Sequence, residues 1–399
     1  MINWQELERK YYIQISPRTP ITIVKGKGAR VWDDAGKEYL DFVAGWAVDS
    51  LGHCHPAVVE AITKQANTLI QTSNQYYTVP QLQLAQLLVE HSCLDRLYVC
   101  NSGAEADEGA VKLARRYGAL KLNGAYEVIT AFNSFHGRTL AMTAATGQEK
   151  FQKPYYPLTP GFKNVPFDDV PAIKSATTDK TCAIMIEPIQ GEGGVNIPAD
   201  NYLKEVRSWC DQKGILLILD EVQTGIGRTG KLFAFQHTDI LPDVLTLAKG
   251  LGSGVPVGAC LARGEAANTF KPGNHGSTFG GNPLACTAGL ATLTALEAAD
   301  LPANATRTGD FLRETFSREF ANEPSVLSIR GIGLMIGIEL DRPCATLVAR
   351  ALEQGLLINV TAERVIRLLP PLIMNLTEAR QLADILIPLV RQFLQENNA

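Results

Sequence analysis

The chain has 399 residues, of which 46% are hydrophobic and 20% charged, and its formal net charge is −4. This composition excludes a disordered, collagen-like or coiled-coil protein, and the acidic balance without a basic stripe argues against nucleic acid or a membrane as partner. Apolar runs are too short for a membrane helix, the first ten residues lack the apolar core of a signal peptide, and the eight cysteines form no C-x-x-C pair, so we expect a cytoplasmic protein with reduced thiols.

The first expected element is a hairpin over residues 31–42, with its turn at Asp34-Ala35-Gly36. Short apolar runs then alternate with helical patterns and glycine-rich turns, which is typical of an α/β fold with a mostly parallel central sheet. A helix is expected over Ala104–Arg115. The predicted strands are Leu97–Cys100, Val128–Ala131, Ala183–Ile186, Ile215–Leu219, Val244–Ala248 and Val257–Leu261.

The pattern changes near residue 300. Strands are expected at Ile336–Leu340 and Leu356–Val360, and a final amphipathic helix begins near Thr377, with a kink at Pro388. We therefore predict a large domain over residues 50–295. Residues 1–49 and 296–399 are expected to form the two parts of a smaller α+β domain.

An acid and a lysine end two of the buried runs. Asp220 closes ILLILD, and Lys249 closes VLTLAK. Apolar surroundings disfavour the ammonium form of a lysine, which lowers its pKa and favours an amine nucleophile. On spacing alone, a structural interpretation is equally good: Asp220 would cap a turn, and Lys249 would be an ordinary exposed lysine.

Three further clusters follow predicted strands, where the ligand crevice of an open α/β sheet lies. Residues 101–105 (NSGAE) offer a phosphate the free N–H groups of a helix start, although a simple serine cap also explains them. In residues 135–138 (FHGR), an aromatic ring and an arginine suit a planar ring and a carboxylate, whereas a core phenylalanine beside a surface arginine is the simpler alternative. Residues 187–194 (EPIQGEGG) hold two acids that turn formation does not explain.

Two motifs are set aside. Residues 225–230 match G-x-G-x-x-G, but five residues separate the strand from the first glycine and no helix follows, which argues against a dinucleotide site. His53-Cys54-His55 has no partner pair with ligand spacing, so no metal site is predicted.

Eight segments together resemble the class III aminotransferases, which are pyridoxal-phosphate enzymes of fold type I, and within them the acetylornithine group is the most similar. The resemblance covers essentially the whole chain. Its segments are LGHCHP (51–56), NSGAEA (101–106), SFHGRT (134–139), EPIQGEGG (187–194), LDEVQTGIGRTG (219–230), LAKGLG (247–252), HGSTFGGNP (275–283) and IRLLPPL (366–372).

The resemblance implies that the large domain binds pyridoxal 5′-phosphate. Lys249 matches the lysine that forms the Schiff base and moves the proton, and Asp220 matches the acid that keeps the pyridine nitrogen protonated. Gln223 would bond the phenolic oxygen, and Phe135 would stack on the ring. The phosphate would be bound by Ser102, Gly103 and Ala104, and by Thr278 of a neighbouring subunit, so the resemblance also implies an obligate homodimer.

The same resemblance implies the substrate contacts. Arg138 matches the arginine that binds the carboxylate remote from the reacting amine, and Arg367 matches the one for the α-carboxylate of glutamate. Glu192 would pair with Arg367 when the amine donor has no carboxylate there. Ser277 is expected to contact the acetylornithine moiety. Trp46 stands where ornithine enzymes have tyrosine.

The implied reaction is a ping-pong transamination from N2-acetylornithine to 2-oxoglutarate, giving glutamate, in arginine biosynthesis. Succinyl-diaminopimelate, acyl-lysine, 4-aminobutyrate and ornithine remain alternative amine donors. An aminomutase of the glutamate-1-semialdehyde type and a non-catalytic α/β protein are further alternatives. Asp107 stands where asparagine is common, and we expect it to point away from the phosphate.

Overall fold

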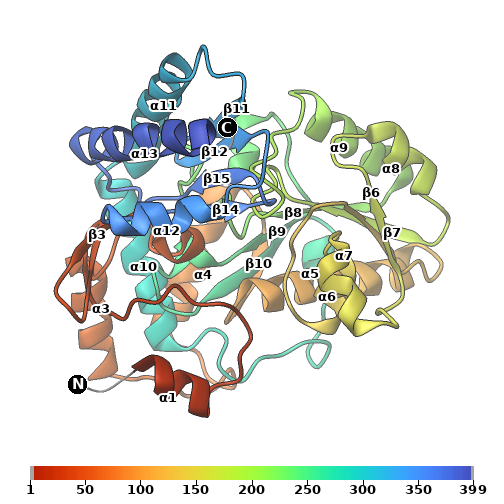
Figure 1. Cartoon of the computed structure of the whole chain (residues 1–399). Coiled ribbons are helices and arrows are strands. Elements are labelled where there is room, and N and C mark those ends of the chain that lie inside the picture. The colour runs from red at the N-terminus through yellow and green to blue at the C-terminus, as the bar shows by residue number, and fades with distance from the viewer. Residues whose placement is uncertain (1–3, 397–399) are drawn as a thin grey trace.

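The computed structural model describes residues 4–396, and a seven-stranded sheet forms the centre of its larger part (Figure 1). The strand order is β4-β10-β9-β8-β7-β5-β6. β10 runs antiparallel to both of its neighbours, and every other pair in this sheet is parallel. The strands are β4 Arg96–Cys100, β5 Glu127–Ala131, β6 Phe162–Val165, β7 Thr181–Ile186, β8 Leu216–Asp220, β9 Val244–Leu247 and β10 Gly258–Ala262.

The six predicted strands of this sheet are all present, so the prediction of a mostly parallel α/β sheet is confirmed. The inner strands β7, β8 and β9 are buried along their whole length because helices cover both faces of the sheet. Strand β6 was not predicted. This edge strand carries the polar residues Lys163 and Asn164, and it therefore lacks the continuous apolar run that marked the others.

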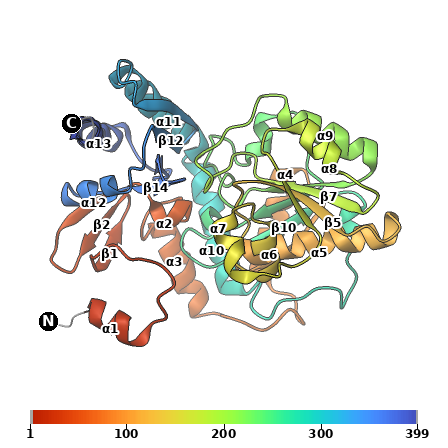
Figure 2. The ribbon, with the colours of Figure 1, turned by 45° about the vertical axis from the view of Figure 1, so that its right-hand side comes forward.

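Helices α5 (Gly103–Lys121) and α6 (Leu140–Ala145) lie on one face of the sheet, and α8 (Val170–Ala176) and α9 (Tyr202–Lys213) lie on the other (Figure 2). α5 begins directly after β4 and packs along β9 and β10. It extends beyond the predicted Ala104–Arg115 at both ends. Its start therefore lies at the carboxyl edge of the sheet.

The other α-helices surround this core and the smaller part of the molecule. No single helix of residues 4–396 has the length and apolarity of a membrane span, and α10 with α11 meets that measure only as a pair bent by 64°. These helices are α1 Trp4–Tyr11, α2 Ala44–Ala47, α3 Pro56–Ala66, α4 Val79–Ser92, α7 Glu149–Gln152, α10 Pro283–Ala298, α11 Leu301–Glu319, α12 Thr346–Glu353 and α13 Leu376–Glu396.

Two four-stranded sheets form the smaller part of the molecule. The first has the order β1-β2-β3-β13, and the second has the order β11-β12-β15-β14. Their strands are β1 Ile23–Lys27, β2 Arg30–Asp33, β3 Glu38–Asp41, β11 Val326–Ile332, β12 Met335–Leu340, β13 Leu356–Leu357, β14 Asn359–Thr361 and β15 Val365–Leu368.

The predicted hairpin is confirmed as β2 and β3. The predicted single strand Leu356–Val360 is wrong, because its two halves belong to different sheets: β13 pairs with β3, and β14 pairs with β15. Ile358, 4% exposed, lies between them in the core. Pro388 lies inside α13, which continues to Glu396.

The pairing of β13 with β3 brings the two ends of the chain into one sheet. In Figure 2 both coloured ends lie on the side away from the seven-stranded sheet. This arrangement agrees with a smaller domain built from both termini. The boundaries at residues 49 and 295 stay a prediction.

The close packing of α5 predicts an unusual response to a glycine substitution. Gly118→Ala would ordinarily stabilise a helix interior by about 1 kcal/mol. Here a Cβ atom at residue 118 would meet the backbone carbonyl of Ala125, so we expect a net destabilisation of about 1–3 kcal/mol.

Thermal unfolding measures this effect. Leu120→Ala, at an exposed position of the same helix, is the control and should change the midpoint little. A Gly118→Ala variant as stable as the parent would contradict the packing.

Candidate active site

A cavity of about 420 Å³ lies where the strands of the large sheet end and α5 begins. This is the edge at which open α/β sheets bind ligands. The predicted site residues that line it are Ser102, Gly103, Ala104, Phe135, Arg138, Glu192, Asp220, Gln223 and Lys249. The structure therefore gathers residues that are up to 147 positions apart (249 − 102 = 147) in one cavity.

Asp220 is the last residue of β8 and is 3% exposed. Its carboxylate accepts hydrogen bonds from His136 Nδ1 at 2.7 Å and from the Val222 backbone N–H at 2.9 Å. Burial favours the neutral acid, but these hydrogen bonds and the charge of His136 hold the pKa of Asp220 below its usual value. An ionised acid in this position can hold a proton on a ligand nitrogen.

His136 was not predicted as a site residue, although it stands inside the FHGR segment. Its ring is fully buried. Burial alone would lower the pKa of His136, but the hydrogen bond and charge of Asp220 raise it. The only sequence signal was its position between Phe135 and Arg138, which both line the cavity.

Lys249 follows β9 and begins a short 3-10 helix, Lys249–Leu251, in a backbone conformation with φ +41°. Within residues 4–396 its ammonium has no hydrogen-bond acceptor and no ion-pair partner. Burial lowers the pKa of Lys249, and the charge of Glu192 opposes that shift. A lysine of lowered pKa is suited to act as an amine nucleophile.

The start of α5 forms one wall of the cavity. The Ser102 side chain caps the helix by accepting a hydrogen bond from the Glu105 N–H at 3.2 Å. The first-turn N–H groups of Gly103 and Ala104 have no acceptor within the helix, and they suit a phosphate. A Cβ atom at residue 103 would lie 2.7 Å from the Val222 side chain, so the close approach requires glycine.

Phe135 and Arg138 follow β5. The Arg138 guanidinium carbon lies 3.9 Å from the ring centroid of Phe151 and 5.3 Å from that of Phe135. No acid in the described chain forms an ion pair with Arg138. Stacking orients the guanidinium while its N–H groups stay available to a carboxylate.

Arg367 lies on β15 and is 1% exposed. Its Nη1 donates to Glu192 Oε1 at 2.7 Å, and its Nε and Nη2 donate to Asn359 Oδ1 at 3.1 and 2.9 Å. Burial would raise the pKa of Glu192, but Arg367 and Lys249 hold it below its usual value. The smaller part of the molecule thus contributes a charge to the site. Asn359 was not predicted as a site residue, because it lies in the segment Leu356–Val360 that was wrongly predicted to be one strand.

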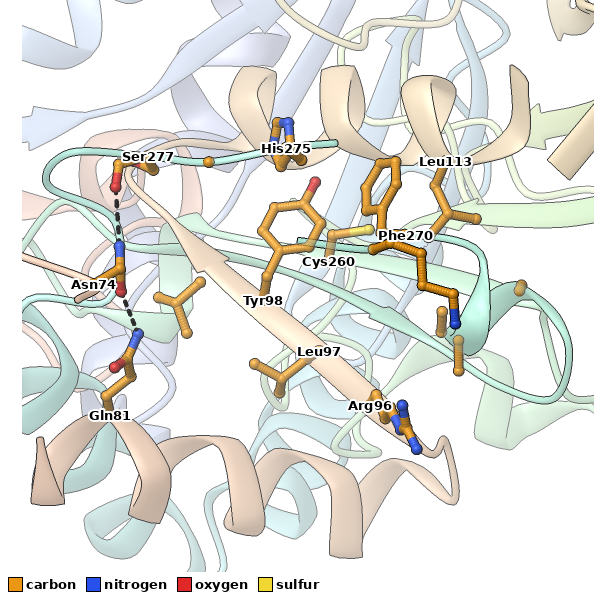
Figure 3. A pocket seen from close by; sticks show the side chains of 16 residues that line it. Asn74, Gln81, Arg96, Leu97, Tyr98, Leu113, Cys260, Phe270, His275 and Ser277 are labelled. Carbon is orange, nitrogen blue, oxygen red and sulfur yellow. Dashed lines mark hydrogen bonds between the residues drawn. The ribbon is translucent and has the colours of Figure 1, made fainter. Parts of the chain in front are cut away.

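Ser277 and Thr278 do not line this cavity within one chain. Ser277 lines a second cavity of about 510 Å³ beside β4 (Figure 3). Its hydroxyl accepts a hydrogen bond from Asn101 Nδ2 at 3.3 Å, and Asn101 also lines the first cavity. The role of Thr278 was predicted for a neighbouring subunit and stays a prediction, as does the substrate contact of Ser277.

Asp107 and Trp46, the two residues that depart from the family pattern, differ in their position relative to the cavity. Asp107 lines the cavity and is 1% exposed, with its carboxyl group near Asp220. Trp46 is 54% exposed in the single chain and lies outside the lining of the cavity. The size of the cavity therefore does not depend on Trp46 within one chain.

The residues fit pyridoxal phosphate. The cavity offers an amine without a partner at Lys249, a helix start for a phosphate at Gly103, and a buried ionised acid at Asp220 for a ring nitrogen. Phe135 supplies an aromatic face and Gln223 an amide. An amine, a phosphate-binding helix start, an acid and an aromatic face are the different groups that this cofactor requires.

Comparisons with known proteins agree with this geometry. A family model described as aminotransferase class-III matches residues 11–390. The chain is 53% identical over 374 residues to the acetylornithine aminotransferase of Methanocaldococcus jannaschii, covering 94% of each chain.

Solved structures show the same likeness. The ornithine aminotransferase of Toxoplasma gondii superposes with a TM-score of 0.95 at 38% identity, over 98% of this chain and 95% of that one. The acetylornithine aminotransferase of Elizabethkingia anophelis gives a TM-score of 0.87 at 34% identity, over 98% of both chains. The prediction of fold type I is confirmed.

The environment of Asp220 predicts a loss of activity on neutralisation. Asp220→Asn keeps the shape of the side chain but removes the charge that would hold a proton on the ring nitrogen. We expect turnover to fall about 10²–10³-fold, a typical effect of one preorganised electrostatic contact.

Turnover and cofactor retention are measured together, with circular dichroism to check the fold. Asp239→Asn, at an exposed acid, is the control and should change neither quantity. A folded Asp220→Asn variant with parental turnover would refute this role.

Proposed function

Because the chain belongs to the class III aminotransferases, we propose that it transfers the δ-amine of N2-acetylornithine to 2-oxoglutarate. The products are the N-acetylated glutamate 5-semialdehyde and glutamate, so that one amine moves and no external oxidant is needed. This reaction is a step of arginine biosynthesis. The observation that carries the substrate assignment is the Arg367–Glu192 pair, whose Glu192 lines the same cavity as an Arg138 without an ion-pair partner in the described chain.

The enzyme is dependent on pyridoxal phosphate. When bound, this group supplies an aldehyde that reacts with amines and a ring that stabilises negative charge on the neighbouring carbon. Lys249 provides the amine that holds the cofactor and then carries the proton at the reacting carbon. Asp220 keeps the ring nitrogen protonated, while Ser102, Gly103 and Ala104 bind the phosphate.

Arg138 serves both substrates in this scheme. It binds the α-carboxylate of acetylornithine and the γ-carboxylate of glutamate, which are each remote from the reacting amine. The guanidinium has no competing acid in the described chain, and its two aromatic neighbours fix its plane. This geometry supports a bidentate contact to one carboxylate.

Arg367 and Glu192 allow one site to accept both substrates. Acetylornithine has no carboxylate beside its reacting amine, and Glu192 then neutralises the buried guanidinium at 2.7 Å. Glutamate has one, which takes the place of Glu192. Without either partner, Arg367 would be a buried unpaired charge, which is strongly unfavourable.

Free ornithine is the second candidate donor, because a solved ornithine aminotransferase superposes with a TM-score of 0.95. Ornithine carries an α-ammonium group beside its α-carboxylate, whereas acetylation removes that charge. No acid among the described residues forms an ion pair with Arg138, so none is held at that arginine to receive the ammonium. This supports the acylated donor.

A homodimer and a cytoplasmic location complete the proposal. Exposed aromatic side chains suit an interface with a second copy: Tyr76 (64% exposed) and Tyr77 (94%) line a cavity that shares Tyr98 with the second one, and Phe279 (64%) follows Ser277 by two residues. Such a copy would bring Thr278 to its neighbour's phosphate. All eight cysteines are free, and six of them are buried, as in a reducing compartment.

A panel of amine donors tests the substrate assignment. With 2-oxoglutarate as acceptor, kcat/KM is measured for acetylornithine, ornithine, succinyl-diaminopimelate, an acyl-lysine and 4-aminobutyrate. We expect acetylornithine to exceed ornithine by about tenfold or more, because an unpaired ammonium must otherwise lose its hydration.

Lys249→Ala is the control and should show no turnover with any donor. A clear preference for another donor would overturn the assignment. Product formation without any keto acid would instead identify an aminomutase.

The Arg367–Glu192 pair predicts a separation of the two half-reactions. In Glu192→Gln the guanidinium keeps a neutral partner and is more available to a carboxylate. We expect the KM for glutamate to fall and the kcat/KM for acetylornithine to fall, each by about threefold to tenfold.

Single-turnover kinetics with each substrate alone measure the two halves separately. Arg138→Ala is the matched comparison, since it should weaken both substrates. Equal changes for both substrates in Glu192→Gln would contradict the exchange of partners.

A further inference from the structure

Asp107 lies in the cavity without a role in the scheme above. It stands four residues after Gly103 on α5, so both residues face the same side of the helix, and both line the cavity. Asp107 is 1% exposed, and its Oδ1 has no hydrogen-bond partner in the described chain. An acid buried to this degree needs a partner or a proton.

The nearest polar groups are Asp220 and His136. One ligand atom of each of the three side chains lies within 4.8 Å of the others, so two buried carboxyl groups stand close together. Two ionised carboxylates this close in a buried place repel each other, and neither has a hydrogen to donate to the other. A proton on one of the two acids removes both difficulties.

His136 cannot neutralise both acids. Its Nδ1 donates to Asp220 Oδ2 at 2.7 Å, and its Nε2 has no partner in the described chain. Asp220 also accepts the Val222 N–H. Two donors thus already stabilise the negative charge on Asp220, whereas Asp107 has only the neutral Thr246 hydroxyl beside it.

The other groups around Asp107 bring no second cation. Glu187, after β7, is an acid that accepts the backbone N–H groups of Phe135 and Gly191. Thr246 on β9 is a neutral hydroxyl. The charge of Lys249 interacts most strongly with that of Glu192. The remaining titratable neighbours are Tyr98, Cys100 and Cys260, whose pKa values burial raises, so that they stay neutral.

We propose that Asp107 keeps its proton in the folded enzyme and donates it to the Asp220 carboxylate in a hydrogen bond. Asp107 is then a positioning residue, which acts on the cofactor through Asp220. The pair carries one negative charge, located on Asp220. The effect on catalysis rests on the proposed function, whereas the location of the proton does not.

The directions of the pKa shifts of the two acids agree with this geometry. Burial and the charge of Asp220 hold the pKa of Asp107 well above its usual value. The same contact works in the opposite sense on Asp220, whose pKa lies below its usual value. Asparagine would supply a similar donor, because its amide N–H can replace the acid O–H.

Infrared spectroscopy of the holoenzyme tests the proton directly. A protonated carboxylic acid has a carbonyl stretch that an ionised carboxylate lacks. At about pH 9 a buried acid with a pKa of about 7, such as Glu187 or Glu221, is ionised. We expect the parent enzyme to retain an acid carbonyl band at that pH and Asp107→Asn to lack it, while Glu187→Gln leaves it unchanged.

Kinetics of two variants test the positioning role. Asp107→Asn keeps a donor for Asp220 and should lose less than about threefold in kcat. Asp107→Leu has a similar size without a donor and should lose about tenfold to a hundredfold in kcat with little change in KM, since a hydrogen bond to a charged group is lost. The absorbance of the bound cofactor as a function of pH should shift in Asp107→Leu and return in Asp107→Asn.

Three results would overturn the inference: no acid carbonyl band in the parent enzyme at about pH 9, a band that persists in Asp107→Asn, or equal damage from asparagine and leucine. A failure of the donor panel would leave the band in place. An absent band would leave the donor preference intact, so the two proposals fail separately.

Discussion

A buried negative charge on Asp220 is the constraint around which the site is built. A carboxylate that is 3% exposed persists only where hydrogen bonds replace water. His136, from the segment after β5, and the Val222 backbone supply them. The end of β8 is thereby tied to a second loop at the same edge of the sheet, and the carboxylate is fixed in the wall of the cavity.

The charges of the cavity are balanced in separate groups. Asp220 is paired with His136, and Arg367 is paired with Glu192 at 2.7 Å. Lys249 lines the same cavity without a direct partner in the described chain. Its pKa is lowered because its own burial outweighs the attraction of Glu192. The same absence of water that makes the pairs necessary therefore lowers the pKa of the lysine and suits it to act as a nucleophile.

Local sequence predicted those parts of the structure that burial on both faces determines. The inner strands are continuous apolar runs, and the residues that end them, Asp220 and Lys249, were found for that reason. The edge strand β6 has no such run and was missed. The segment Leu356–Val360 was predicted as one strand, because its apolar residues do not reveal that two different sheets bury them.

Prediction of the site from the sequence was limited in a similar way. Motifs located the segments, but contacts between segments depend on the completed fold. His136 and Asn359 gained their roles from partners 84 and 8 residues away. The environment of Asp107 depends on which face of α5 meets β8 and β9. Periodicity gives the side of a helix that is buried, and only the structure shows that an acid lies against another acid there.

The Arg367–Glu192 pair is unequal, and that inequality favours one way of exchanging substrates. The Arg367 side chain is 0% exposed and is held by Asn359 through two N–H groups. The Glu192 side chain is 28% exposed and lies in a glycine-rich segment. Water can therefore receive the carboxylate at little cost, while moving the arginine would break its contacts with Asn359. In the proposed reaction the acid would therefore be the partner that leaves when a substrate carboxylate arrives, and the arginine would remain in place for both half-reactions.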